Sequence, residues 1–246
     1  MYDVSQTWKT LVAQDNHYFK TRVKINNVTY TQDKIFEITT NLRMFSEEQP
    51  TVGGCLSTEI TVKLLTPSAS IPRMAKIEPF VQVTDGTTSS EWIPQGTFWV
   101  DTREETKNDD GLDILTLHGY DAMLKAEADM PVAAVSHRDT TWVRIIANAM
   151  GLQPTIPGYA GIDPRTATAN DGGTGLMKND YNFSVPPGYS MREVLSNIAA
   201  MYCGNWVISY DNKLLLIALN GIPSETNYLI NAIGEAITFG GDKILV

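Results

Sequence analysis

The clearest alternation of apolar and polar residues in the chain lies between Leu56 and Leu65. Successive side chains of an extended strand point to opposite faces of a sheet. The apolar positions that share one face are Ile60, Val62 and Leu64. The polar positions on the other face are Glu59, Thr61 and Lys63. This pattern predicts a strand with one buried face and one face in water.

A long β-hairpin is predicted further along the chain. Its two strand-like segments, Gly96 to Thr106 and Leu112 to Leu117, are separated by Lys107-Asn108-Asp109-Asp110-Gly111. Asn, Asp and Gly tolerate the positive φ that tight turns require. The hairpin is acidic at its tip and apolar along its body, which favours a place in a barrel wall over a role as a catalytic loop.

Further short strands are predicted in the first half of the chain. Thr21 to Ile25 and Val28 to Thr31 meet at Asn26-Asn27, which indicates a second hairpin. A proline-interrupted link, Thr66 to Pro79, precedes another strand. The other strand-like segments are Lys34 to Phe45 and Phe80 to Thr84. About seven strands within ~120 residues are typical of an antiparallel barrel or sandwich.

Two short helices are expected beside these strands. Ser5 would cap the first, whose apolar side carries Trp8, Leu11 and Val12. A helix this short is not stable alone, so it must dock on another element. The second helix-like segment, Asp121 to Ala128, directly follows the long hairpin.

Past Met130 the apolar period changes from two to 3.6. Asp139 is expected to cap a helix over 140–150 that Gly151 ends. Ser190 and Glu193 form a capping box that opens another helix, which ends near Gly204. The apolar face of that helix carries Val194, Leu195, Ile198, Ala199 and Tyr202. A hairpin about Asp211-Asn212 follows, with strands Trp206 to Tyr210 and Lys213 to Leu219.

These elements predict an α+β protein that is mainly β. Residues 1–130 would form an antiparallel β-barrel domain with a short N-terminal helix, and residues 131–225 a small α+β domain. Residues 154–187 have little periodicity, which indicates either a contact arm or a partly mobile segment. Residues 226–246 return to strand-like sequence. We interpret them either as the start of a second barrel, in a chain cut from a longer one, or as a strand that completes the earlier sheet.

Composition narrows the choice of partners. The formal net charge is −9, and residues 1–130 carry −7 of it. An acidic surface repels phosphate backbones, so tight nucleic-acid binding is not expected. No segment approaches the roughly 18 apolar residues of a membrane span, and no signal peptide is recognisable. The two cysteines, Cys55 and Cys203, lie far apart and are expected to be free thiols.

The residue types that usually carry catalysis or bind metals do not fall in the patterns that such sites require. His17, His118 and His137 lack metal-ligand spacing. Cys203 would lie near the C-terminal end of its helix, where the helix dipole disfavours a thiolate. Glu104 and Glu105 would point to opposite faces of a strand.

Two loop motifs fail as well. If Gly111 held the sixth place of an EF-hand loop, Thr106 and Leu117 would hold positions that require carboxylates. The glycines of residues 172–175 lack the following Gly-Lys-Ser/Thr of a phosphate loop. We therefore predict no catalytic, cofactor-binding or metal-binding residues and no cofactor.

Several turn and strand segments of the chain together show a similarity to a known family. In the first 130 residues the similar segments are Gly53-Gly54-Cys55-Leu56, Ile71 to Ile77, Trp92 to Phe98, Lys107 to Gly111 and Leu117 to Asp121. In the later part they are Pro187-Gly188-Tyr189-Ser190, Arg192, Glu193 and Leu195, with the Gly-x-Trp and hairpin that follow. Together these segments resemble the N-terminal part of the central baseplate hub, or tail-tip protein, of phages and prophages of Gram-positive bacteria. The later segment resembles the domain inserted in such hubs.

This resemblance implies a structural virion protein without enzymatic activity. Hubs of this family are trimers whose chains each contribute two tube-like β-barrels to a ring that meets the tail tube. The implied partners are sister copies, the tail tube, the distal tail and tape-measure proteins, and the tail spike or tip. DNA would pass without specific binding, and the particle would be assembled in the host cytoplasm. The present chain departs from the pattern, because the sequence predicts only one complete barrel.

Two alternative functions remain beside this one. The chain could be the hub region of a tail-associated cell-wall hydrolase, whose catalytic part usually lies further along the chain. It could also be a carbohydrate- or receptor-binding β-module. The latter would depend on exposed tryptophans among Trp92, Trp99, Trp142 and Trp206.

Overall fold

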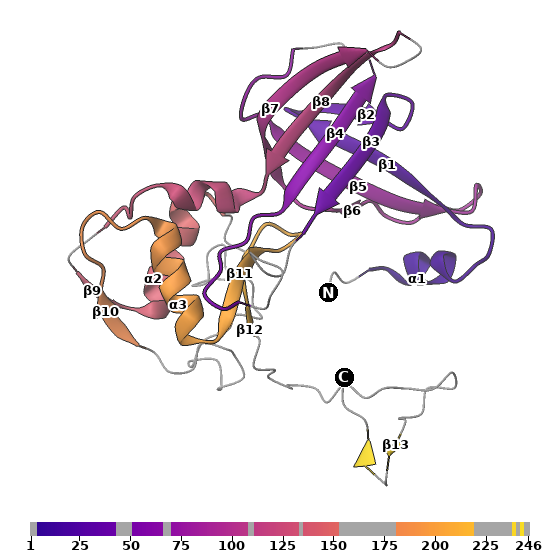
Figure 1. The fold of residues 1–246 in the computed structure, drawn as a ribbon. Coiled ribbons are helices and arrows are strands. Elements are labelled where there is room, and N and C mark those ends of the chain that lie inside the picture. The colour runs from indigo at the N-terminus through magenta and orange to yellow at the C-terminus, as the bar shows by residue number, and fades with distance from the viewer. Residues whose placement is uncertain are drawn as a thin grey trace.

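The computed structural model describes residues 4–42, 51–65, 70–107, 111–132, 135–152 and 181–218, together with strands at 238–239 and 242–243. The described chain forms two units (Figure 1). Each unit has its own hydrophobic core. The first unit holds α1 and β1 to β8, and the second holds η1, α2, α3 and β9 to β12. Among the described residues, no helix is long and apolar enough to cross a membrane.

The first unit is built around one antiparallel sheet. Its strands are β1 (Tyr18–Ile25), β2 (Val28–Thr31), β3 (Ile35–Asn41), β4 (Glu59–Leu65), β5 (Lys76–Thr84), β6 (Ile93–Pro94), β7 (Phe98–Lys107) and β8 (Asp113–Tyr120). The hydrogen-bonded order is β2-β1-β5-β7-β8-β4-β3, and β6 pairs with β5. The expected antiparallel, mainly β architecture is therefore confirmed.

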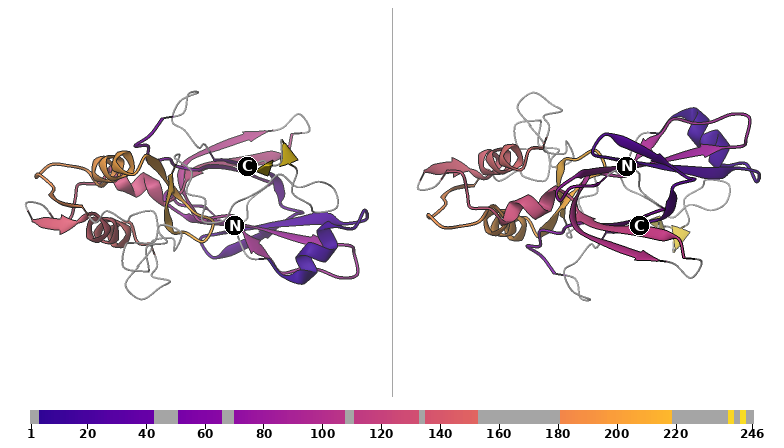
Figure 2. Two further views of the ribbon diagram at one scale, coloured as in Figure 1. Left: turned by 90° about the horizontal axis from the view of Figure 1, so that it is seen from below. Right: turned by 90° about the horizontal axis from the view of Figure 1, so that it is seen from above.

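The sheet curls around its core but is not closed. Its two ends, β2 and β3, are consecutive in the chain and are joined by a turn in which the Lys34 amide donates to the Thr31 carbonyl at 2.8 Å. The two strands do not pair with each other in the described structure, so the expected closed barrel is not confirmed. Figure 2 shows the first indigo hairpin, β1–β2, and the magenta pair β7–β8 on opposite sides of the curled sheet. The side chains packed between them are Val23, Ile25, Tyr30, Ile60, Val62, Leu64, Ile71, Ala75, Ile77, Phe98, Val100, Leu115 and Leu117.

Local predictions in this unit are largely confirmed. Ile60, Val62 and Leu64 are buried on one face of β4. Asn26 and Asn27 take positive φ, 46° and 69°, in the turn between β1 and β2. The long hairpin forms as β7 and β8.

The short N-terminal helix α1 (Gln6–Val12) is also present. The Ser5 hydroxyl accepts a hydrogen bond from the Trp8 amide at 3.1 Å, as expected for its N-cap. Only Leu11 is buried, whereas Val12 is 40% exposed, so the expected apolar face is narrower than predicted.

The proline-interrupted link was predicted to extend to Pro79, and this boundary is wrong. Strand β5 begins at Lys76 and runs through Pro79, which pairs with Val23 of β1. The Pro79 carbonyl accepts from the Gln95 amide at 2.9 Å, on the side opposite β1. On that side β5 changes partner from β7 to β6, so no ladder bond requires the N–H that proline lacks.

The second unit packs helices against a hairpin. Its elements are η1 (Ala122–Glu127, a 3₁₀ helix), β9 (Ser136–Arg138), α2 (Asp139–Ala149), β10 (Asn182–Ser184), α3 (Met191–Met201), β11 (Gly204–Ile208) and β12 (Leu214–Ala218). Trp142, Trp206, Ile146 and Leu195 are among its fully buried side chains. Cys55, Ala122, Met123 and Ala126 also belong to this core, although they precede the boundary predicted at residue 130. That boundary stays a prediction.

Two predicted helix ends differ from the structure. Arg138 occupies the N-cap of α2, and Asp139 is its fully buried first residue rather than its cap. Helix α3 ends at Met201. The left-handed residue that follows it is Cys203, with φ of 51°, and not Gly204, near which the helix was expected to end. Gly204 instead begins β11, where a β-carbon would lie 2.6 Å from the Ile217 carbonyl oxygen. The Ser190–Glu193 capping box and the end of α2 at Gly151, with φ of 73°, are confirmed.

Several predictions fall outside the described residues. They include the end of the strand expected to reach Phe45, the acidic tip at 108–110 and the glycines at 172–175. Most of the segment 154–187 is also outside, although 182–184 form β10 against β9. Of the predicted returning strands, only β13 (Thr238–Phe239) and β14 (Asp242–Lys243) are described, paired with each other.

Candidate functional site

Strand β3, at one end of the sheet, carries the most exposed large hydrophobic side chain of the described residues, Phe36. This side chain is 56% exposed. Ile35 pairs with Leu64 and Glu37 pairs with Lys63, which leaves Phe36 as the extra residue of a β-bulge. Bulges re-aim side chains and are frequent at sheet edges. The sequence carried a signal for it, because adjacent Ile35 and Phe36 break the alternation of a half-buried strand.

The free edge of β3 combines apolar and polar groups. In the described structure β3 pairs with β4 alone. Ile35 and Ile38 pack against the first core, while Leu42, just past the strand, is 53% exposed. Glu37 forms an ion pair with Lys63 at 2.6 Å, and this bond lowers the pKa of the Glu37 carboxyl. We name residues 35–42 the β3 edge. Its chemistry suits pairing with another strand and offers no reactive group.

The other end of the sheet, β2, is shorter and contains a buried hydroxyl. Val28 is 42% exposed, whereas Tyr30 is only 5% exposed and lies in the first core. The Tyr30 hydroxyl has no hydrogen-bond partner among the described atoms. Burial raises the pKa of this phenol. The group is therefore a neutral core side chain without a proton acceptor nearby.

The structure places the three histidines apart. His17 lies edge-on to Phe19, and His137 lies edge-on to Trp142 in the second unit. The ring of His118 hydrogen-bonds the Thr61 hydroxyl at 3.1 Å on the sheet. The described residues contain no group of three or more His, Cys, Asp or Glu side chains that could hold a metal ion.

The two cysteines are also apart, and both are free. Cys55 is buried in the second core, where desolvation raises the pKa of its thiol to about 11. Cys203 is exposed just past the end of α3, close to its predicted place. The raised pKa of Cys55 is the opposite of what activates a nucleophilic cysteine.

The remaining acidic and aromatic candidates have partners or are buried. Glu104 and Glu105 pair with Thr116 and Leu115, adjacent positions of β8, so they point to opposite faces as predicted. Trp142 and Trp206 are fully buried. A cation lies over each of the other two rings. The Arg22 Cζ is 4.4 Å from the centroid of the Trp92 ring, and the Lys125 Nζ is 4.0 Å from that of Trp99. No broad aromatic platform for a sugar is found at these four positions.

A hollow of about 380 Å³ lies beside β7. Its charged groups are already engaged, because Arg73 pairs with Asp101 at 3.4 Å and Arg103 donates to the Ile71 carbonyl at 2.9 Å. The Arg73 side chain is 80% exposed, so its ion pair contributes little. This opening does not bring acid, base and nucleophile together.

No protein-family model and no curated protein matches the chain. The fold is similar to that of the 43 kDa tail protein of prophage MuSo2 from Shewanella oneidensis, with a TM-score of 0.52 and 11% identity. That likeness covers 82% of this chain and 56% of the other. The tail protein from Neisseria meningitidis MC58 gives a lower TM-score of 0.48 at 12% identity, covering 89% of this chain and 53% of the other. This chain thus spans a little over half the length of either, and the first likeness shows a shared fold alone.

Proposed function

We propose that the chain is a structural, non-enzymatic component of a phage or prophage tail. In this role it acts as a central baseplate or tail-tip hub, whose copies form a ring that adapts the tail tube to the tip and lets DNA pass. The observation that carries the proposal is the β3 edge, an open strand edge with an outward Phe36, on a curved sheet whose fold is similar to a prophage tail protein. A Gram-positive host is inferred from the sequence resemblance alone.

The physical support is the combination of an open sheet and an acidic chain. Open strand edges offer main-chain donors and acceptors to a neighbouring chain, and a symmetric ring uses the same pair of surfaces repeatedly. The formal charge of −9 disfavours adhesion of DNA to the wall of such a ring. The proposed partners are sister copies in a trimer, the tail tube, the distal tail and tape-measure proteins, and the spike or tip.

Assembly of a matched pair of variants tests the proposal. Phe36→Ser removes the apolar contact from the β3 edge, while Phe19→Ser removes a Phe of similar exposure, 47%, from β1. Light scattering after size exclusion and negative-stain imaging, each with and without the tail tube protein, would report rings. We expect threefold rings for the wild type and Phe19→Ser, and at least a tenfold weaker association for Phe36→Ser.

Three results would contradict the proposal. One is a wild-type chain that forms no ring even with its tube partner. Another is equal loss of assembly in both Phe variants. The third is peptidoglycan release by the purified chain, which would favour the hydrolase alternative.

A further inference from the structure

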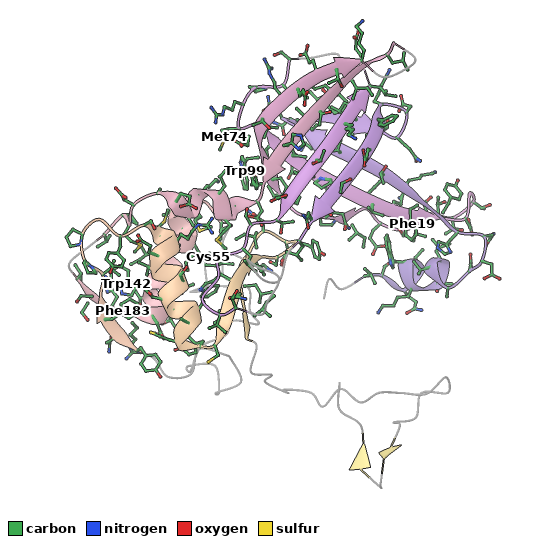
Figure 3. All side chains as sticks on the ribbon, viewed as in Figure 1. Phe19, Cys55, Met74, Trp99, Trp142 and Phe183 are labelled. Atoms are coloured by element: carbon green, nitrogen blue, oxygen red, sulfur yellow. The ribbon has the colours of Figure 1, made fainter. Side chains whose placement is uncertain are left out.

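Two short chain crossings connect the sheet to the second unit. The first leads from residues 53–58 into β4, and the second leads from the end of β8 into η1. Residues 53–56 run along β11 and form three backbone hydrogen bonds with it, each of 2.8 Å. The amides of Gly53 and Leu56 donate to the carbonyls of Gly204 and Trp206, and the Trp206 amide donates to the Gly54 carbonyl. The first crossing therefore forms an added parallel strand beside the β11–β12 hairpin. Figure 3 places Cys55 and Trp99 at this junction.

The Asp121 carboxylate accepts hydrogen bonds from both crossings. It is 2% exposed and accepts from the Thr58 amide at 2.8 Å and the Ser57 hydroxyl at 2.9 Å on the first crossing. On the second crossing it accepts from the Met123 amide at 2.9 Å. The Asp121 amide also donates to the Thr58 carbonyl at 3.1 Å. A single buried carboxylate thus ties the two crossings together.

The Arg192 guanidinium of α3 donates hydrogen bonds to carbonyl groups of the same two crossings. It donates to the carbonyl of Cys55 on the first crossing and to that of Met123, at 3.3 Å, on the second. Its Nε also forms an ion pair with Glu127 at 2.5 Å. A planar guanidinium presents donors on separate nitrogens in a rigid fork, so it reaches carbonyls on both crossings, whereas the three donors of an ammonium group all lie on one nitrogen.

We propose that Asp121 and Arg192 form a clasp that fixes the orientation of the second unit on the sheet. One residue binds the donors of the two crossings and the other binds their acceptors. Each unit has a separate core, and the contact of Trp99 with the second core and with Lys125 also spans the junction. Opening the clasp therefore loosens the orientation and leaves both cores folded. The crossings then act as a hinge about residues 56–59 and 120–122. In the proposed hub this hinge would set how the second unit projects from the ring, but the clasp does not depend on that role.

Hydrogen exchange read by mass spectrometry, combined with small-angle scattering of the full chain, tests the clasp. Arg192→Met and Asp121→Ala would each remove one half, and Arg192→Lys would keep the charge without the planar fork. We expect amide exchange at 54–58 and 121–124 to rise roughly 10- to 100-fold and the radius of gyration to increase. Peptides around Ile77 and Leu195, in the two cores, should keep their protection. Arg73→Met, which removes an exposed ion pair, is the matched control and should change nothing.

Two outcomes would overturn the proposal. If exchange at the crossings and the radius of gyration stay at wild-type values in Arg192→Met, the guanidinium does not hold the junction. If both cores lose protection together even in Arg192→Lys, the two units unfold as one and no hinge exists. Ring formation is measured separately, so its failure would leave these results interpretable.

Discussion

A β-carbon placed on Gly119 would lie 2.5 Å from the carbonyl oxygen of Trp99, closer than any real β-carbon approaches a backbone atom. The two residues lie on β8 and β7, next to the bulge between Val100 and Thr102. Trp99 also packs against the second core, so this close approach lies where the sheet meets the second unit.

Gly119→Ala is therefore expected to destabilise the protein. The β-carbon forces β7 and β8 apart, at a cost of roughly 2–3 kcal/mol in the free energy of unfolding. Urea denaturation followed by circular dichroism measures the loss. Gly111→Asn is the control, because a β-carbon there meets no atom within 4 Å and Asn tolerates its positive φ of 76°. A loss as large in the control would show that the Trp99 contact is not the cause.

The two thiols should react at very different rates. Cys203 is exposed, whereas Cys55 is buried with a thiol pKa of about 11. Ellman's reagent at pH 8 is expected to label one thiol rapidly in the native chain and both in denaturant. Cys203→Ser should abolish the rapid phase, and Cys55→Ala should leave it intact. Rapid labelling of Cys203→Ser would contradict the buried position of Cys55.

The same burial predicts a pH dependence of stability. The folded-state pKa of Cys55 is raised from 9.0 to about 11, so the unfolded chain loses this proton first as the pH rises. The contribution of the protonated Cys55 thiol to the free energy of unfolding is fully present below pH 9. It is lost between pH 9 and 11, which lowers this free energy by roughly 2–3 kcal/mol. Urea unfolding at pH 8 and 10.5 should show a larger drop for the wild type than for Cys55→Ala. Equal drops would remove Cys55 as the cause.

The capping box of α3 is expected to contribute measurably to the second unit. The Ser190 hydroxyl accepts from the Glu193 amide at 3.2 Å, and Glu193 accepts from the Ser190 amide at 2.7 Å. Ser190→Ala removes the first of these bonds and should cost about 1 kcal/mol. Ser190→Thr retains an acceptor and should cost only a fraction of that. If the two variants are equally stable in thermal unfolding, the side-chain bond does not stabilise the helix.

Features set by neighbouring residues were predictable from the sequence. The alternation of Ile60, Val62 and Leu64 identified β4, Asn26-Asn27 identified a turn, and Ser190 with Glu193 identified a helix start. In each case the residues involved lie within a few positions of one another, and the local backbone decides the outcome.

Features set by distant partners were not predictable. Pro79 lies inside β5 because that strand changes partners there, which depends on the positions of β6 and β7. Cys55 runs beside Trp206, about 150 residues later, through backbone bonds that have no sequence signature. For the clasp residues the sequence predicts only local roles: Asp121 begins a helix-like segment, and Arg192 belongs to the capping-box segment. Their contacts with each other's crossings depend on the tertiary fold.

The bulge at Phe36 has a consequence for the chain before it meets any partner. A flat, regular strand at the edge of a sheet can pair with the same strand of another copy, and repeated pairing of this kind produces fibres. The extra residue kinks β3 and interrupts the even spacing of its donors and acceptors. We expect this kink to hinder the stacking of copies edge to edge, so that pairing at the β3 edge requires a partner strand that accommodates the bulge.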